Sequence, residues 1–196
     1  MKNSLQFTGI YGILDEKFSQ GRTNLQVAAE MLAAGVRIIQ YREKSKPALY
    51  KYQQCLRLRQ LTRQAQAALI INDDVALAML VDADGVHLGQ EDLPLAQVRQ
   101  LLGSEKLIGV STHSPRQAKE AVAGGADYIG VGPIFHTATK DAGAPVGLEY
   151  LEYVVKELPI PAVAIGGINE HNLKEVVAAG ACCVCLISDL LGAEEL

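Results

Sequence analysis

The sequence predicts an α/β protein, a single (β/α)8 TIM barrel that spans residues 1–196 as one domain. Short runs with strand character alternate with longer amphipathic stretches along the whole chain. The 196 residues, 49% of them apolar, suffice for one core and are too few for two comfortable domains. Strands that alternate with helices indicate parallel pairing, and eight such units fit a closed barrel near the lower size limit of that fold, roughly 200 residues.

Eight runs are expected to form the strands. They are residues 9–14, 36–41, 68–71, 85–88, 107–111, 128–132, 162–165 and 183–187. Near-continuous apolar runs such as 162–165 are typical of buried parallel strands. An open doubly wound sheet is the alternative, and the absence of a G-x-G-x-x-G pattern after the first strand weakens it.

Amphipathic stretches between these strands are expected to be helices, the clearest being 25–34, 48–67 and 115–123. Glycines that commonly end helices follow several of them: Gly35, Gly103, Gly124 and Gly180. Ser114 precedes Pro115, which predicts a helix with a serine N-cap and proline at the first position.

Composition excludes several classes of protein. Lys and Arg number 18 against 22 Asp and Glu, so no general positive field exists for nucleic acid, and an anionic ligand must be held by a few placed cations. Residues 1–9 lack the apolar region of a signal peptide, and the longest nearly apolar run, 176–187, is too short to span a membrane. These features predict a cytoplasmic protein, and the four cysteines show no zinc-binding spacing.

Polar side chains at the ends of the strands are the candidates for function, because chemistry in such barrels sits where strands pass into the following loops. In the second strand Gln40, Arg42 and Lys44 fall on one face if the strand stays extended that far. They would bring an amide and two cations to the barrel mouth. The alternative is that the strand ends at Tyr41 and the cations are solvated.

Carboxylates follow the third and fourth strands. Asn72, Asp73 and Asp74 end the third strand, and Asp92 comes shortly after the fourth. Hard oxygen ligands near a phosphate site suggest Mg²⁺, which takes one or two carboxylates together with phosphate oxygens and water. Asp73 or Asp74 could instead cap the next helix, and Asp92 could cap the helix that begins near Pro94.

Hydroxyls, glycines and a lysine mark the remaining strand ends. Ser111 ends the fifth strand, and the long loop 132–145 after the sixth carries Thr137, Thr139 and Lys140. Loops of this length are often binding loops or lids, although an ordinary surface loop is the alternative. The paired glycines Gly166 and Gly167, and Ser188 after the eighth strand, fit the phosphate site common in this fold.

Together these segments resemble the thiamin phosphate synthase family. The matching pieces, in the family's order, are Gln40-Tyr41-Arg42-Glu43-Lys44, Asn72-Asp73, Asp84-Gly85-Val86-His87-Leu88-Gly89-Gln90 with Asp92, Gly109-Val110-Ser111, Gly130-Val131-Gly132-Pro133, Thr137-Ala138-Thr139-Lys140, Ile165-Gly166-Gly167-Ile168 and Ile187-Ser188. Each piece is weak alone, but eight in order at strand ends are highly specific.

The resemblance implies roles for individual residues. Those expected to bind the pyrimidine diphosphate are Gln40, Arg42, Lys44, Asn72, Ser111 and Lys140. Those expected to receive the thiazole phosphate are Thr137, Thr139, Gly167, Ile187 and Ser188. Asp73 and Asp92 are expected to hold Mg²⁺, and the catalytic set is Arg42, Lys44, Ser111 and Lys140.

The implied reaction is dissociative: diphosphate leaves the pyrimidine methylene carbon, and the thiazole nitrogen attacks the resulting cation. Such chemistry needs electrostatics and positioning and no protein nucleophile. The expected partners are therefore two small-molecule substrates, and neither nucleic acid nor a membrane is expected to bind. A homo-oligomer is possible. The nearest rivals are a thiazole tautomerase on the same barrel, disfavoured by Pro133 where an acid/base histidine is expected, and a non-catalytic thiamin-precursor binding protein.

Overall fold

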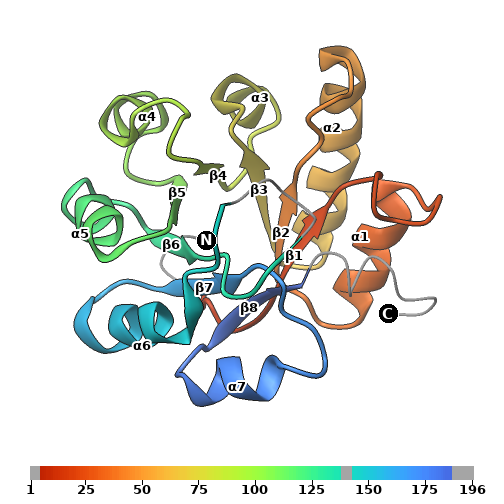
Figure 1. The fold of residues 1–196 in the computed structure, drawn as a ribbon. Coiled ribbons are helices and arrows are strands. Elements are labelled where there is room, and N and C mark those ends of the chain that lie inside the picture. The colour runs from red at the N-terminus through yellow and green to blue at the C-terminus, as the bar shows by residue number, and fades with distance from the viewer. Residues whose placement is uncertain (1–4, 138–142, 187–196) are drawn as a thin grey trace.

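The computed structural model describes residues 5–137 and 143–186, and these form a closed parallel barrel (Figure 1). Each strand pairs with the next along the chain, and β8 pairs with β1 to close the cylinder. The strands are β1 (Gly9–Leu14), β2 (Ile38–Tyr41), β3 (Ala68–Asn72), β4 (Gly85–Leu88), β5 (Leu107–Thr112), β6 (Tyr128–Val131), β7 (Ala162–Ile165) and β8 (Cys183–Leu186).

Helices surround the barrel on the outside, as Figure 1 shows. They are α1 (Asn24–Ala33), α2 (Ala48–Gln64), α3 (Val75–Leu80), α4 (Leu95–Leu102), α5 (Pro115–Ala123), α6 (Gly147–Glu157) and α7 (Leu173–Ala178). The predicted (β/α)8 barrel is thus confirmed. No helix in the two described ranges is long and apolar enough to cross a membrane.

Several boundaries differ from the sequence prediction by a few residues, and at the start of β2 the reason is identifiable. β2 begins at Ile38 and not at Val36, because the Val36 N–H still donates to the Met31 carbonyl in the turn that closes α1. The predicted bounds of α5, 115–123, are confirmed, and of the two glycines that follow this helix Gly125 takes the left-handed conformation, with a φ of 81°. The Ser114 cap of α5 is as predicted, since its side chain accepts from Gln117 N.

Apolar side chains form two shells between strands and helices and a third cluster inside the barrel. The inner cluster contains Tyr11, Tyr128, Cys183 and Cys185, and Phe7 stacks on the Tyr128 ring at 4.5 Å between centroids. The interior is therefore packed at its base, so a ligand must enter from the carboxyl ends of the strands.

Aspartates brace the amino-terminal end of the barrel in two equivalent places. Asp84, directly before β4, accepts from the Leu69 N–H of β3 at 2.8 Å and from Arg59 of α2 at 2.7 Å. Asp127, directly before β6, accepts from the Ile108 N–H of β5 and from Arg99 of α4. Each aspartate thus ties a strand to its neighbour and to an outer helix.

Candidate active site

A central cavity opens at the carboxyl end of the barrel. Its lining combines aromatic and aliphatic side chains of the barrel interior with polar groups from six strands or strand ends. The residues of the predicted site that line it are Gln40, Arg42, Asn72, Ser111 and Thr137. An apolar hollow with a few convergent polar groups is the usual form of a small-molecule site.

The base of this cavity is a row of neutral polar side chains. Gln40 Nε2 donates to the Tyr11 hydroxyl at 2.8 Å, and the Tyr11 and Tyr128 hydroxyls lie 2.9 Å apart. His87 contacts Tyr128 through Nδ1 at 3.1 Å and Ser111 Oγ through Nε2 at 2.9 Å. Burial raises the pKa of both tyrosines well above the usual value, so each hydroxyl keeps its proton.

Arg42 reaches the cavity from just beyond β2. The strand ends at Tyr41, which was the alternative to a longer strand. The Arg42 N–H nevertheless continues the hydrogen-bond pattern of the sheet by donating to the Leu14 carbonyl at 3.0 Å. The Arg42 side chain is mostly buried and pairs with Asp15 at 2.9 Å, so it is not a solvated surface cation. This pair uses one guanidinium nitrogen, and the fork geometry of arginine leaves other N–H groups for an anion.

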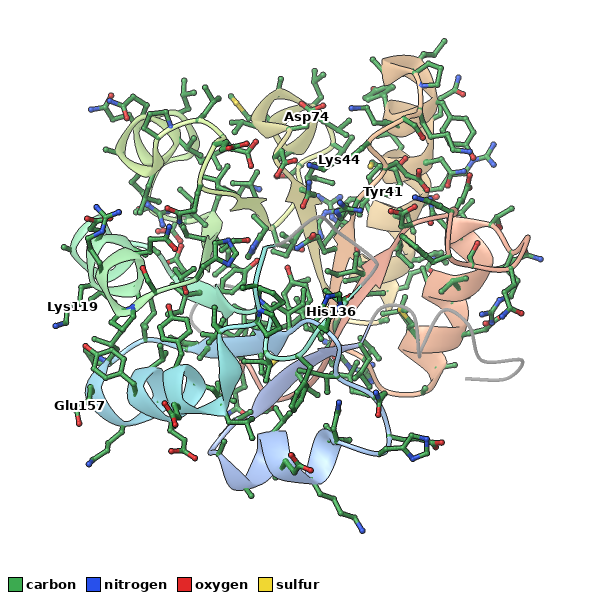
Figure 2. The ribbon with its side chains drawn as sticks, in the orientation of Figure 1. Tyr41, Lys44, Asp74, Lys119, His136 and Glu157 are labelled. Atoms are coloured by element: carbon green, nitrogen blue, oxygen red, sulfur yellow. The ribbon has the colours of Figure 1, made fainter. Side chains whose placement is uncertain are left out.

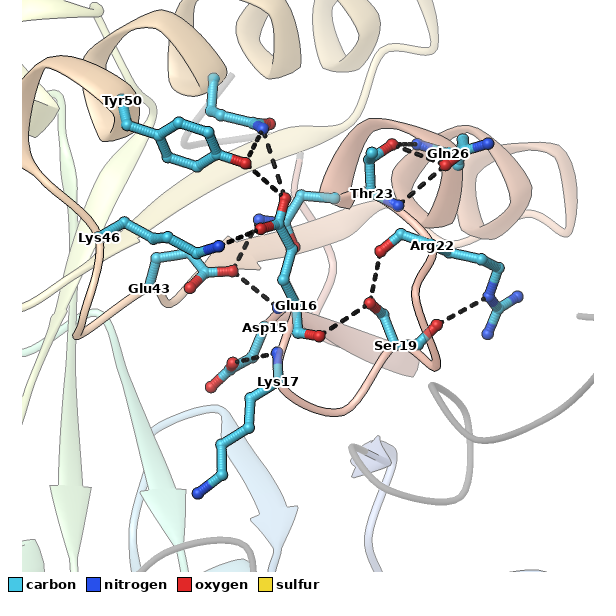
Figure 3. Close-up of polar contacts among 12 residues, drawn as sticks. Asp15, Glu16, Lys17, Ser19, Arg22, Thr23, Gln26, Glu43, Lys46 and Tyr50 are labelled. Atoms are coloured by element: carbon cyan, nitrogen blue, oxygen red, sulfur yellow. Dashed lines mark hydrogen bonds and ion pairs between the residues drawn. The ribbon is translucent and has the colours of Figure 1, made fainter.

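A polar network joins the loops that follow β1 and β2 (Figure 3). Glu43 Oε1 accepts from the Glu16 N–H at 2.7 Å and from Asn24 Nδ2 at 2.9 Å. Burial acts against ionisation of Glu16, but hydrogen bonds from Lys46 and Tyr50 outweigh it and lower the pKa of Glu16. The ionised Glu16 therefore links the two loops that carry Asp15 and Arg42.

Lys44 takes a different direction from Gln40 and Arg42. The expected row of three does not form, because the strand ends before Lys44 and its side chain is 58% exposed. Lys44 Nζ lies 3.2 Å from Asp73 Oδ2 beside the central cavity, in a second hollow that includes Asp74. Figure 2 shows Lys44 and Asp74 on the same side of the barrel, and Asn72 lines both hollows.

Asp73 and Asp74 follow β3 directly and have different tasks. Asp74 Oδ1 accepts from the Leu77 N–H and caps α3, so the predicted capping role belongs to Asp74. Asp73 has a φ of 60° and donates its N–H to the His87 carbonyl of β4. This left-handed turn separates the two side chains, and a non-glycine residue in this conformation is common at functional sites.

Asp92 lies within hydrogen-bonding reach of Asp73. It does not cap α4, whose first turn follows Pro94; its Oδ2 instead accepts from the Gly89 N–H at 2.6 Å in the same loop. Burial and the neighbouring Asp92 raise the pKa of Asp73 despite the opposing effect of Lys44. Two neighbouring ionised carboxylates repel each other unless a proton or a cation lies between them.

This donor set fits Mg²⁺. Asp73 and Asp92 supply hard oxygen ligands from neighbouring loops, and burial together with the nearby Asp92 raises the pKa of Asp73, which a bound cation would oppose. No group of three or more His, Cys, Asp or Glu residues able to hold a metal occurs within 5–137 and 143–186. A magnesium ion here would therefore need further oxygens from substrate and water, which is its common mode of binding.

The loop after β6 covers the end of β7. The Ile134 and Phe135 N–H groups donate to the Ile165 and Gly166 carbonyls at 2.9 and 3.0 Å. A side chain at Gly167 would place Cβ 2.5 Å from the His136 carbonyl oxygen, so glycine is required for this loop to lie against β7. The Gly166–Gly167 pair thus holds the loop segment that leads to Thr137 against β7.

The structure brings most of the predicted residues to one end of the barrel. Gln40, Arg42, Asn72, Ser111 and Thr137 line the central cavity, whereas Lys44, Asp73 and Asp92 stand beside it and Gly167 lies under the β6–α6 loop. Four predicted residues lie outside the described ranges: Thr139, Lys140, Ile187 and Ser188.

Sequence reasoning missed two groups at this site. Tyr11 and Tyr128 read as ordinary strand residues, and only their inward position turns their hydroxyls toward Gln40 and His87. Asp15 was not singled out either, although it follows β1 directly and pairs with Arg42. Its place at a strand end was the signal that could have identified it.

Comparison with known proteins gives a consistent result. The family model described as thiamine monophosphate synthase matches residues 10–190. The chain is 57% identical to the thiamine-phosphate synthase of Pelotomaculum thermopropionicum and 52% identical to that of Caldicellulosiruptor saccharolyticus, over 95% of this chain and 86% and 85% of those proteins.

A solved structure, the thiamine phosphate pyrophosphorylase from Pyrococcus furiosus, superposes with a TM-score of 0.88 at 38% identity. The match covers 96% of this chain and 89% of that one. The fold, the strand-end residues and these similarities agree, and the chain belongs to the thiamine monophosphate synthase family.

Proposed function

We propose that this chain is a transferase that joins 4-amino-2-methyl-5-(diphosphooxymethyl)pyrimidine to thiazole phosphate, giving thiamin phosphate and free diphosphate. The observation that carries the proposal is the junction at Asn72, where the mostly apolar central cavity, which Arg42 also lines, meets the hollow that holds Lys44 and Asp73. An aromatic ring fits the apolar part of the first, and a charged diphosphate fits where the two meet, since the first contributes Arg42 and Ser111 and the second contributes Lys44. The bond to be broken lies between ring and diphosphate.

The reaction is dissociative. The bond between the methylene carbon and the diphosphate oxygen breaks, and its electron pair leaves with the diphosphate. The pyrimidine ring delocalises the positive charge on the methylene carbon until the thiazole nitrogen donates its lone pair to form the new C–N bond. Protein groups need only stabilise the departing anion and hold the two substrates in line.

Arg42 and Lys44 are the cations that would stabilise the departing diphosphate. Asp15 restrains Arg42 at the cavity wall, so its remaining N–H groups are oriented before substrate arrives. Lys44 is exposed and already adjacent to Asp73, so it can move between carboxylate and diphosphate at small cost. Lys140, which lies outside the described ranges, is the third cation of the predicted set.

Asp73 and Asp92 would hold Mg²⁺. When bound, the ion neutralises negative charge on the diphosphate and so makes it a better leaving group. Ser111 and Asn72 would bind polar atoms of the same substrate from the cavity wall. Thr137, Thr139, Gly167, Ile187 and Ser188 are the residues proposed to receive the thiazole phosphate.

The testing experiment incubates the purified chain with both substrates and Mg²⁺ and measures thiamin phosphate and diphosphate released in equal amounts. Arg42→Ala should lower kcat/KM by about 10²- to 10³-fold, the usual loss when one group that stabilises a developing charge is removed. Arg116→Ala is the matched control, because Arg116 is an exposed helix residue paired only with Glu120 among the described residues. Absence of product from the folded wild-type chain would refute the proposal.

A further inference from the structure

The row of side chains at the base of the cavity is continuous from Gln40 to Ser111. It passes through Tyr11, Tyr128 and His87, with neighbouring polar atoms between 2.8 and 3.1 Å apart. It crosses the barrel interior from β2 through β1 and β6 to β4 and β5. Its five members therefore act as one hydrogen-bonded chain and not as five separate residues.

Space for this chain exists because β5 has a glycine opposite Tyr128. A Cβ at Gly109 would lie only 2.1 Å from Tyr128 Cζ and 2.5 Å from its hydroxyl oxygen. Tyr128 is fully buried, and Phe7 stacks on its ring from below. The position of the Tyr128 hydroxyl is thus fixed by packing on both sides.

The first member favours one direction for the hydrogen bonds, although either tyrosine hydroxyl could donate to the other. The Gln40 amide nitrogen can only donate, so the Tyr11 oxygen accepts from it. Tyr11 then has its own proton for Tyr128, and Tyr128 has its proton for His87 Nδ1. His87 Nδ1 is an acceptor in this arrangement, so a neutral His87 carries its proton on Nε2 and donates to Ser111 Oγ.

The consequence appears at the last member of the chain. Because Ser111 Oγ accepts from His87, its own hydrogen is available to an acceptor in the cavity. Run in reverse, the same contacts would make Ser111 donate to His87 and present only lone pairs to the cavity, which would repel an anion. The direction of the chain therefore decides whether Ser111 can stabilise the diphosphate.

We propose that Gln40, Tyr11, Tyr128 and His87 form a directional hydrogen-bond relay that orients the Ser111 hydroxyl as a donor toward the leaving group. Tyr11, Tyr128 and His87 are positioning residues, since they act through Ser111. This inference deepens the proposed function and rests on it for the identity of the anion. The relay itself exists whether or not that anion is a diphosphate.

The first measurement is independent of activity. Nitrogen-15 NMR of the His87 ring in the ligand-free chain at neutral pH should show a protonated Nε2 and an unprotonated Nδ1. The chain has four histidines, and a His87→Gln variant identifies the His87 signals by their loss. A ring protonated on Nδ1 alone would mean that the relay runs in reverse, and this would overturn the proposal.

The second measurement is a double-mutant cycle on the reaction. Tyr128→Phe removes the donor to His87 and should lower kcat by about 10-fold, the value of one net hydrogen bond, with little change in KM for thiazole phosphate. In a Ser111→Ala background the same substitution should have almost no further effect on kcat. Equal losses in both backgrounds would show that Tyr128 acts without Ser111 and would contradict the relay.

Tyr150→Phe is the matched control for loss of a buried hydroxyl. The Tyr150 hydroxyl contacts Thr112 Oγ1 at 2.8 Å and the Ser114 carbonyl at 2.9 Å, next to Ser111 in sequence but outside the relay. This variant should leave both the His87 tautomer and kcat as in the wild type. A correct tautomer in a chain without synthase activity would refute the proposed function alone, whereas a wrong tautomer in an active enzyme would refute the relay alone.

Discussion

The two ends of the barrel use carboxylates in opposite ways. At the amino-terminal end, Asp84 and Asp127 are each satisfied by a backbone N–H and an arginine. At the carboxyl end, burial and the nearby Asp92 raise the pKa of Asp73 even though Lys44 lies 3.2 Å from it. Paired charges stabilise the fold, whereas charges left in conflict can be satisfied by a ligand, so stability and binding are assigned to different ends of the same strands.

The largest effect is expected at the amino-terminal end. Asp84→Ala leaves Arg59 buried without its partner and the Leu69 N–H without its acceptor, which should lower the free energy of unfolding by about 3–5 kcal/mol. Urea denaturation measures the loss. Asp127→Ala is the matched comparison and should lose less, because the Arg99–Asp127 pair is more exposed than Arg59–Asp84. Equal losses in the two variants would mean that the burial of the ion pair does not determine how much stability each aspartate contributes.

A smaller effect, on binding and not on folding, is expected from Asp92→Asn. The amide keeps an oxygen for the Gly89 N–H but removes a negative ligand, so the Mg²⁺ concentration for half-maximal activity should rise by about 10-fold or more. Titrating Mg²⁺ in the steady-state assay measures it. Asp82→Asn is the control, because Asp82 contacts Arg63 and Lys106 and lies in neither hollow. An unchanged magnesium requirement would remove Asp92 from the metal site.

The smallest effect concerns the pH dependence of stability. The folded-state pKa of Asp73 is raised above the ordinary value near 3.8. Above that pH the folded chain therefore binds more protons than the unfolded chain, so the ionisation of Asp73 lowers the stability of the fold as pH rises. Asp73→Asn should remove this cost and raise the metal-free Tm at pH 7 by about 1–2 °C, with no gain at pH 3. Thermal melts at both pH values in chelator test it, and a lowered Tm at pH 7 would contradict the sign.

Local patterns predicted the fold well, because each strand is a short apolar run bounded by turn residues. The runs 9–14, 85–88 and 162–165 agree with β1, β4 and β7 residue for residue. Local patterns also found the Ser114 cap and limited the cap of α3 to Asp73 or Asp74, of which the structure shows Asp74. These features depend on residues within four positions of each other, which a sequence displays directly.

Contacts between distant residues were not predictable in the same way. Tyr11 and Tyr128 are 117 residues apart, and their hydrogen bond depends on the closure of the barrel. Lys44 was expected in a row with Arg42, but β2 ends at Tyr41 and the side chain turns toward Asp73. Alternation along a strand holds only while the backbone stays extended, and the sequence does not state where a ladder stops.

Asn72 has one further consequence, for the length of molecule that the site accepts. Its side chain is shared by the central cavity and the outer hollow, so the two compartments are separated by the width of a single residue. A compound that occupies both can therefore have only a short linker between its aromatic ring and its anionic group. We expect Asn72 to limit the length of the linker: an analogue with one extra carbon in the linker could not place its ring in the central cavity and its anionic group in the outer hollow at the same time.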